Sequence, residues 1–204
     1  MCSGDGGFSR YALETGHQVF RFDDNPRFAN VPRTFQKDVW DFDADTFADA
    51  DVLLASPPCQ WATVPSIGAH WTGGYRAYQP KDAETIRLWA LAQHCLEIVR
   101  DSKIPIAVME QLEGLSGKLL TERPTGKVWL CQYGDTRAKP TLLWGRFPEG
   151  FEFKKCHNGN PDHASAPRGS KTPGSTQGMK GSARRADMYF LGRYLFQCLE
   201  GPKP

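Results

Sequence analysis

The feature that most constrains the fold is a strand–helix–strand pattern between residues 51 and 110. Apolar runs at residues 51–55 and 104–109 flank a segment, 80–100, whose apolar residues recur at nearly helical spacing. Short continuous apolar runs are typical of strands that are buried on both faces, and a helix between two such strands favours parallel pairing. The sequence therefore predicts an α/β, Rossmann-like fold, in which a mainly parallel sheet has helices on both faces.

The segment at residues 80–100 is the best helix candidate in the chain. Asp82 is placed to cap its first turn, and we expect Ile86, Leu96 and Val99 on its inner face. Further strands are expected at 18–22, 128–133 and 141–144, and a terminal helix at 183–199. Together these elements predict that strands and helices alternate along most of the chain.

The domain organisation follows from length and local composition. At about 150 residues per domain, 204 residues form one domain with a small appendage. The stretch after residue 145 is rich in Gly, Pro, Ser, Lys and Asn and has little periodicity, which is typical of a long loop. We expect three parts: a main domain, a basic loop region and a helix that packs back on the main domain, at residues 1–145, 146–182 and 183–204.

Composition excludes several classes of protein. Hydrophobic residues make up 40% and charged residues 24% of the chain, as in folded globular proteins. No run approaches the ~18 apolar residues of a membrane span, and no signal peptide is visible, so we expect a cytoplasmic protein. The six cysteines form no C-x-x-C pair, which argues against a disulfide framework or a metal site and favours reduced thiols.

The net charge of +2 conceals a strong asymmetry along the chain. Residues 1–60 contain five Lys or Arg and ten Asp or Glu, whereas residues 154–193 contain eight Lys or Arg and two Asp. A basic segment of this kind predicts either a polyanionic partner or a solvated basic loop, and charge alone does not separate them.

A glycine-rich turn at the start of the chain predicts a ligand site. The turn at Ser3–Ser9 precedes a helix-like segment, and about twenty residues later Asp23 ends a strand. Glycines let a ligand approach the backbone, and an acid at that spacing is placed to accept hydrogen bonds from a ribose, as in nucleotide-type cofactor sites. The strand that should precede such a turn is truncated or missing, because the sequence starts at Met1.

The sharpest chemical signal is Pro57-Pro58-Cys59-Gln60, directly after the strand at 51–55. Two prolines stiffen the loop and hold the thiol just beyond the strand. Glu110 ends the neighbouring predicted strand, so a cysteine and an acid meet at one rim of the sheet, where ligands bind in such folds. A structural cysteine beside a solvated carboxylate is the alternative interpretation.

Taken in order, these residues resemble the cytosine-C5 DNA methyltransferases, and most closely the short members found in phages and prophages. Pro-Pro-Cys followed by a correctly spaced Glu is the specific part of the resemblance, which runs over nearly the whole chain. The matching segments are Cys2–Ser9, Phe22–Pro26, Lys37–Trp40, Ser56–Gln60, Met109–Leu112, Cys131–Gly134 with Lys139–Thr141, and residues 174–186.

The resemblance implies that S-adenosylmethionine is the cofactor. Asp23 would hold its ribose and Asp38 would accept a hydrogen bond from its adenine amino group. The residues implied in cofactor binding are Ser3, Gly4, Gly6, Phe8, Asp23, Asp38 and Pro57.

The resemblance also implies a covalent mechanism on double-stranded DNA. Cys59 would attack C6 of a cytosine flipped out of the duplex, and Glu110 would hydrogen-bond N3 and the exocyclic amine. Arg137 and Lys139 would contact the base or the backbone near the site, and with Cys59 and Glu110 they form the implied catalytic set. The residues implied in nucleic-acid contact are Gln60, Lys154, Lys155, Arg184 and Arg185. In a phage-borne enzyme in a bacterial host, such methylation is expected to protect DNA from restriction.

Two departures from the family pattern keep alternatives open. Gln111 stands where the family usually has Asn, and about 35 loop-like residues replace a full target-recognition region. The small region predicts low or short-context specificity, or specificity supplied by an accessory subunit or a homodimer. It also leaves open another donor and an RNA or nucleotide substrate. The missing first strand leaves open a non-catalytic nucleic-acid-binding protein.

Overall fold

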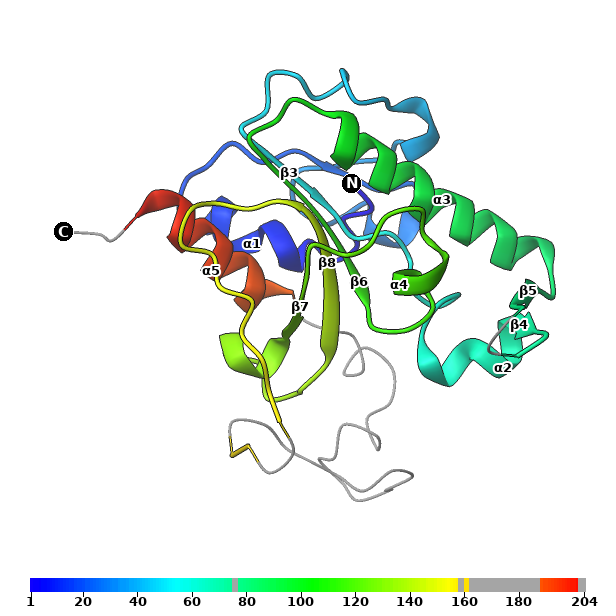
Figure 1. Ribbon diagram of the computed structural model, residues 1–204. Helices are drawn as coiled ribbons and strands as arrows, with labels where there is room; N and C mark the ends of the chain where they lie inside the picture. The colour runs from blue at the N-terminus through cyan, green and yellow to red at the C-terminus, as the bar shows by residue number, and fades with distance from the viewer. Residues whose placement is uncertain (75–76, 158–159, 162–187, 202–204) are drawn as a thin grey trace.

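The centre of the protein is a four-stranded mixed sheet in the order β3–β6–β8–β7 (Figure 1). The computed structural model describes residues 1–74, 77–157, 160–161 and 188–201. Strand β3 (Val52–Ala55) runs parallel to β6 (Ile106–Leu112), with Ala55 opposite Met109. Strand β8 (Pro140–Arg146) is antiparallel both to β6 and to β7 (Gly126–Trp129).

The expectation of a mainly parallel sheet is therefore wrong for this sheet, although the α/β class is confirmed. Strand β7 ends at Trp129 and β8 begins at Pro140, and the 3₁₀ helix η4 (Leu130–Tyr133) fills part of the connection. A parallel pair needs a crossover of about a dozen or more residues, whereas this connection turns back directly. Gly134, at φ +116°, ends η4 in the left-handed conformation and reverses the chain.

Two small sheets flank the central one. Strands β1 (Arg21–Phe22) and β2 (Thr34–Phe35) pair in parallel, and β4 (Trp71–Thr72) pairs antiparallel with β5 (Gln79–Pro80). The strand expected at 18–22 is thus reduced to two residues.

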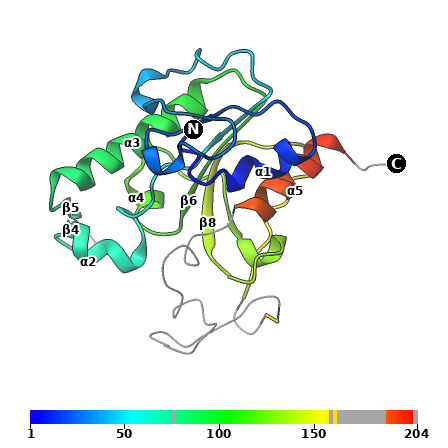
Figure 2. The same ribbon diagram turned by 180° about the vertical axis from the view of Figure 1, so that it is seen from behind.

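Helices cover both faces of the central sheet. Figures 1 and 2 show α3 (Ala83–Asp101) on one side and α1 (Gly7–Glu14) beside α5 (Tyr189–Glu200) on the other. The two hydrophobic cores follow the strand alternation of β6, because Ala107 and Met109 join the core under α3, whereas Ile106 and Val108 join the core under α1 and α5. A β-carbon on Gly192 would lie 2.1 Å from the Phe8 carbonyl oxygen, so glycine permits the close contact of α5 with α1.

Helix α3 begins where the sequence predicts, because the Asp82 carboxylate accepts a hydrogen bond from Thr85 N at 2.7 Å. Leu96 and Val99 are buried as expected, but Ile86 is 52% exposed because Thr85 and Leu88 take the inner positions of the first turns.

The C-terminal end of α3 is fixed by Arg146 at the end of β8. Its guanidinium donates to the carbonyl oxygens of Val99, Arg100, Ser102 and Ile104 and to the Ser102 hydroxyl, at 2.8–3.3 Å. Carbonyl groups at a helix end have no partner within the helix, so this one side chain supplies the missing donors. Two other helices, α2 (Ile67–His70) and α4 (Ser116–Leu119), are single turns in loops.

Candidate functional site

The carboxyl ends of β3 and β6 bring the Pro57–Cys59 loop next to Glu110. The loop leaves β3 after Ala55, and Glu110 follows the paired residue Met109. On the far side of the loop, Leu115 N donates to Ala62 O at 2.7 Å, and a β-carbon on Gly114 would lie 1.9 Å from that oxygen. The loop is therefore held by β6 at one end and by the β6–α4 connection at the other.

Cys59 is a partly buried thiol in a site that disfavours its ionisation. Burial raises the pKa of Cys59 to about 12, and the negative charge of Glu110 adds to the rise. The Cys59 and Leu112 backbone N–H groups and the Lys139 ammonium act in the opposite direction. Cys59 is therefore a protonated thiol at neutral pH in this state, next to groups that can favour its thiolate.

Glu110 is poised to titrate near neutrality. Burial raises the pKa of Glu110 to about 7, whereas the Ser56 hydroxyl and the charge of Lys139 lower it. A carboxyl group with this pKa can be a hydrogen-bond donor or an acceptor at neutral pH, which suits proton exchange with a bound ligand.

Lys139 joins this pair from the start of β8. Burial first, and then the charge of Arg137, lower the pKa of Lys139 to about 8, against the favourable charges of Asp135, Cys59 and Glu110. Its backbone has φ +31°, an uncommon conformation for a non-glycine residue. The structure thus brings three of the predicted catalytic residues together, on three different segments.

Arg137, the fourth predicted catalytic residue, is held in an ion pair. Its guanidinium donates to Asp135 Oδ1 at 2.7 Å and Oδ2 at 2.6 Å, and the Asp135 side chain is 3% exposed. A buried bidentate pair fixes Arg137 in place, so it acts on the site through the charge that it presents to Lys139.

Gln111 is a residue whose role the sequence did not reveal beyond its being an unusual side chain for the family. It is fully buried, and its Nε2 donates to the Pro57 carbonyl oxygen at 2.5 Å. Its Oε1 is buried without a hydrogen-bond partner. Glu110 accepts from Ser56 while Gln111 donates to Pro57, so consecutive β6 side chains hold consecutive residues of the loop.

The glycine turn is tied to the end of β1. Gly4 N donates to Asp23 Oδ2 at 2.7 Å, and Gly4 and Gly6 have φ +52° and +76°. Arg21, which the sequence analysis did not single out, donates to Gly6 O, Ser9 Oγ and Pro32 O and is 4% exposed. Its only sequence signal is a charge inside the apolar run at 19–22.

The predicted cofactor residues Asp23 and Asp38 line one cleft with Cys2 and Leu91. The two carboxylates can accept hydrogen bonds, which fits the hydroxyl and amino groups of an adenosine. The predicted residue Ser3 does not line this cleft; its buried Oγ, which has no hydrogen-bond partner, belongs to a residue that lines a separate cavity. The cleft has a volume of only about 10 Å³, so these side chains must separate to admit a nucleoside. Asp38 Oδ1 accepts a hydrogen bond from Trp40 N at 3.1 Å, and this bond fixes the orientation of the carboxylate.

Other predicted contacts lie elsewhere. Phe8 is a core residue of α1, and Pro57 is buried within its loop. Gln60 and Lys155 are exposed, and the partly exposed Lys154 has its ammonium 4.4 Å from the centre of the Tyr194 ring. Arg184 and Arg185 lie outside the described residues, as does the segment 174–186.

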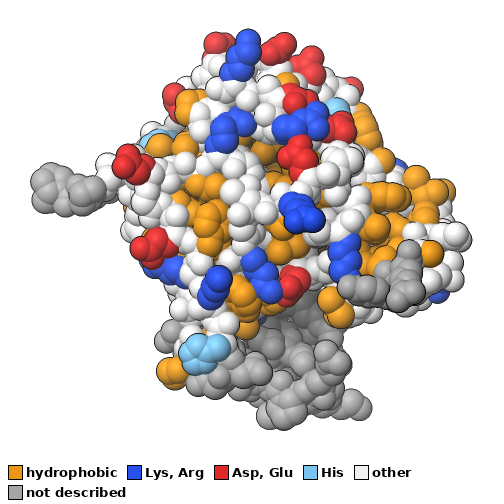
Figure 3. Space-filling model, viewed as in Figure 1, with side chains coloured by type: hydrophobic (Ala, Val, Ile, Leu, Met, Phe, Trp, Pro, Cys, Tyr) orange, Lys and Arg blue, Asp and Glu red, His pale blue; other side chains and the backbone are white. Residues whose placement is uncertain are grey.

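Figure 3 shows acidic side chains gathered at the top of this face, and Lys and Arg side chains spread over its middle and lower parts. Most of residues 154–193 lie outside the described part of the chain, so this face does not test the charge asymmetry of the sequence.

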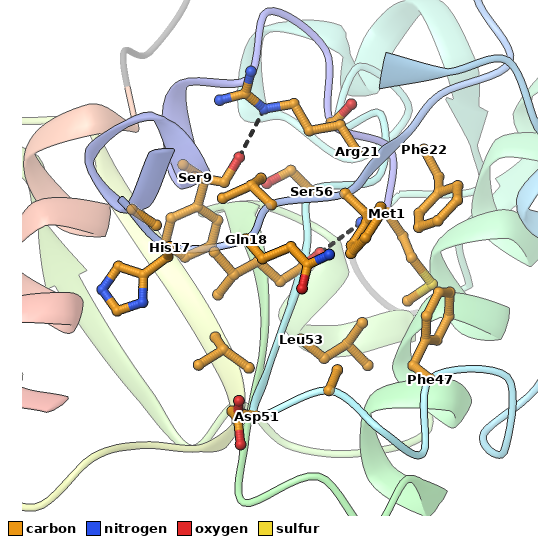
Figure 4. Close-up of a pocket in the computed structure, with 18 of the residues that line it drawn as sticks. Met1, Ser9, His17, Gln18, Arg21, Phe22, Phe47, Asp51, Leu53 and Ser56 are labelled. Carbon is orange, nitrogen blue, oxygen red and sulfur yellow. Dashed lines mark hydrogen bonds between the residues drawn. The ribbon is translucent and has the colours of Figure 1, made fainter. Parts of the chain in front are cut away.

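A second cavity lies away from Cys59, Glu110 and Lys139. It has a volume of about 630 Å³ and lies between residues 18–22 and residues 51–54, with Met1 at one end (Figure 4). Ser56 is the only residue of the Ser56–Gln60 loop that lines it, and Cys59, Glu110 and Lys139 do not. Two predicted cofactor residues, Ser3 and Phe8, also line it, so the cavity adjoins the glycine turn but not the group of Cys59, Glu110 and Lys139.

Comparisons with known proteins add no relative: no protein-family model matches the chain, and no curated protein matches its sequence. None of the described helices is long and apolar enough to cross a membrane. Within the described part of the chain, no group of three or more His, Cys, Asp or Glu residues could hold a metal ion.

Proposed function

We propose that the chain is a DNA (cytosine-5)-methyltransferase that uses S-adenosylmethionine. The observation that carries the proposal is the electrostatic contact of Cys59, Glu110 and Lys139 at the rim of the sheet. Nucleophilic addition to a nitrogen-containing aromatic ring needs a nucleophile, an acid that hydrogen-bonds the ring and a charge that favours the ionised nucleophile. A thiol, a carboxyl group that titrates near pH 7 and a cation can fill these three roles.

Cys59 is the nucleophile in this proposal. C5 of cytosine is a poor nucleophile, and addition of a thiolate at C6 shifts the electron pair of the C5–C6 double bond toward C5. The sulfur must lose its proton first, and the Lys139 ammonium and the Leu112 N–H favour the thiolate. The thiol proton passes to solvent water. After transfer, water takes the C5 proton, the C5–H electron pair re-forms the C5–C6 double bond, and the C6–S electron pair leaves with Cys59 as a thiolate.

Glu110 links base binding to this activation. When protonated, it can donate to N3 of the cytosine, where negative charge develops as the sulfur adds. Protonation also removes the charge that raises the pKa of Cys59. Binding of the base to Glu110 therefore makes the thiolate easier to form.

The methyl donor would be held by the glycine turn and the acidic pair. Bound S-adenosylmethionine supplies an electrophilic methyl group. Asp23 would accept from the ribose while it keeps its bond to Gly4 N, and Asp38 would accept from the adenine amino group. The unpartnered Ser3 Oγ lines the neighbouring cavity and offers one more hydrogen-bonding group next to the glycine turn.

Double-stranded DNA is the proposed substrate, with the basic segment as its electrostatic contact. Gln60 is exposed beside Cys59, where it can reach the space that a flipped base leaves. Lys154 and Lys155 would bind phosphate groups, and so would Arg184 and Arg185. A specificity subunit or a second copy of the chain remains part of the proposal because the region between β8 and α5 is short.

Nucleoside mass spectrometry on DNA from cells that express the chain tests this proposal. We expect 5-methylcytosine with the wild type, none with Cys59→Ala, and wild-type levels with the matched control Cys198→Ala, which removes a thiol at the far end of α5. A different added mass on deoxycytidine would show another donor. Modification of RNA or free nucleotide alone, or none despite cofactor binding, would favour the respective alternatives over DNA methylation.

A further inference from the structure

Two cysteines from different segments of the chain meet at the outer edge of the central sheet. Cys131 lies in η4, directly after the edge strand β7, and Cys156 lies on the segment that follows β8. Both are free thiols, and the Cys156 side chain is a hydrogen-bond partner of the Cys131 thiol. A disulfide joins β-carbons that are only about 4 Å apart, so contact between two thiols is its first requirement.

Hydrogen bonds to neighbouring residues hold both cysteines at this edge. Trp129 N donates to Lys154 O at 3.3 Å, so the segment that carries Cys156 covers the edge of β7 (Figure 1). The Tyr133 hydroxyl donates to Glu152 O at 2.6 Å and accepts from Lys154 N at 3.0 Å. Each cysteine is two residues from one of these bonded positions, so the surrounding structure brings the two thiols together.

Aromatic packing fixes the same segment along β7. The Phe151 ring is stacked on the Tyr133 ring, with their centres 6.4 Å apart, and lies 5.5 Å from the Tyr194 ring of α5. The Phe153 ring occupies the space beside Gly126, where an added β-carbon would lie only 2.2 Å from it. Residues 151–154 therefore form a packed cover over an edge strand whose backbone groups would otherwise face solvent.

The two thiols differ in exposure and in reactivity. Cys131 is 5% exposed, and burial, followed by the hydrogen bond with Cys156, raises its pKa to about 11. The thiolate is the reactive form, so Cys131 reacts poorly with a dissolved oxidant. Cys156 is partly exposed and meets such an oxidant first. An accessible thiol next to a shielded one is the arrangement of an attacking and a resolving cysteine.

We propose that Cys131 and Cys156 are an oxidative modification site, where a peroxide forms a reversible disulfide that fastens the cover at residues 151–156 to the edge of β7. Disulfides in reducing compartments are transient and serve as redox sensors, so this site is compatible with thiols that are otherwise reduced. The site does not depend on the proposed methyltransferase activity, because its evidence is the contact of two thiols and the packing around them.

The oxidation takes two steps. The Cys156 thiolate attacks one oxygen of hydrogen peroxide, the S–O bond forms, the O–O bond breaks, and the released hydroxide takes up the thiol proton as water. The Cys131 sulfur then attacks the Cys156 sulfur, the S–S bond forms, and hydroxide leaves with the Cys131 proton as a second water. The two thiols lose two electrons, and the peroxide is reduced to two water molecules. The second step joins groups already in contact, which favours it over attack by another molecule.

A second pair of contacting thiols, Cys2 and Cys95, lacks this access. Cys95 is 0% exposed, and its hydrogen bond with Cys2 and its burial raise its pKa well above the usual value. Cys2 lines the cleft of about 10 Å³ that holds Asp23 and Asp38, and a space of this size admits about one water molecule. A dissolved peroxide therefore reaches Cys156 more readily than either member of this pair.

Peptide mapping by mass spectrometry tests the site on the purified full chain. The protein is treated with hydrogen peroxide, the remaining thiols are alkylated, and disulfide-linked peptides are counted before and after dithiothreitol. We expect the Cys131–Cys156 link to be at least tenfold more abundant than any other and to disappear on reduction. In the oxidised protein, Tm should rise by about 5 °C, and hydrogen exchange at the Trp129 amide should slow about tenfold.

Two variants control for other effects of peroxide. Cys156→Ser should show neither the link nor the two shifts. Cys198→Ser is the matched control, because it removes another partly exposed thiol, which donates to Gly150 O, and it should behave as the wild type. A Cys2–Cys95 link in place of the expected one would overturn the proposal, and so would sulfinic acid at Cys156 without a link. Equal shifts in the wild type and Cys156→Ser would overturn it as well.

Discussion

The two ends of strand β6 differ in how completely their polar groups are satisfied. At the amino end, Arg146 opposite Ala107 donates to the carbonyl groups that end α3. At the carboxyl end, Glu110 and Lys139 have pKa values moved toward neutrality, and Gln111 Oε1 has no partner. One end is locked by saturated hydrogen bonds, whereas the other keeps unsatisfied and desolvated groups.

The amino end of β6 therefore contributes mainly to stability, whereas its carboxyl end is suited to ligand chemistry. Buried charges and an orphaned amide oxygen cost folding free energy, and they persist where a ligand can satisfy them. The amino end offers a ligand nothing, because its donors and acceptors are already paired. Substitutions at the two ends should therefore move different measurements.

The largest expected effect is the loss of methyl transfer in Glu110→Gln. We expect the rate to fall about 1,000-fold, because a group that donates and accepts protons at the base is removed. In the wild type, the carboxyl takes up a proton on folding between pH 4.5 and about 7, so its contribution to stability is present at low pH and lost as pH rises through 7.

Glu110→Gln should therefore be more stable than the wild type at pH 8 and not at pH 4. Thermal unfolding at the two pH values measures this, alongside single-turnover methylation. A variant that loses activity and also unfolds more easily at pH 8 would contradict this interpretation. It would show that the buried Glu110 carboxylate stabilises the fold instead of waiting for a ligand.

The next largest effect is expected at the opposite end, in Arg146→Leu. It leaves carbonyl oxygens at the end of α3 without donors, so we expect the free energy of unfolding to fall by about 3 kcal/mol. Urea denaturation measures this change, and the activity per folded molecule should stay unchanged. Arg87→Leu is the matched control, because Arg87 pairs with Glu84 on the exposed side of α3 and should cost less than about 0.5 kcal/mol. Equal losses in both variants would remove the contrast between the two ends.

The smallest expected effect is in Gln111→Leu, which keeps the side-chain volume and removes the donor to Pro57 O. We expect kcat to fall about tenfold with an unchanged dissociation constant for S-adenosylmethionine, since a displaced Cys59 loop costs positioning. Stability should change little, because the lost bond is offset by removal of an unpartnered oxygen. Gln93→Leu, whose amide bonds Thr121 far from the loop, should leave kcat unaltered. A stability loss without a change in kcat would reduce Gln111 to a structural residue.

Much of the rim could be predicted from the sequence. Apolar runs ending in Ser56 and Glu110 gave two strands, and parallel pairing of neighbouring strands places their carboxyl ends together. The Asp82 cap and the helix after it were predictable for the same reason, because capping and helical spacing are local. The exposure of Ile86 could not be predicted in this way. Whether Thr85 or Ile86 faces the core depends on the segments that pack against α3, which the local sequence does not show.

What the sequence by itself determined is the order of elements and the place of Cys59 and Glu110, because turns, caps and apolar runs act over a few residues. Only the tertiary structure decided that β8 runs antiparallel beside β6, which brings Lys139 to the rim. It also decided the contacts of Gln111 and Arg21, the pKa values and the cavity lined by Met1. These depend on burial and on hydrogen bonds between segments far apart in the chain, and no local pattern encodes them.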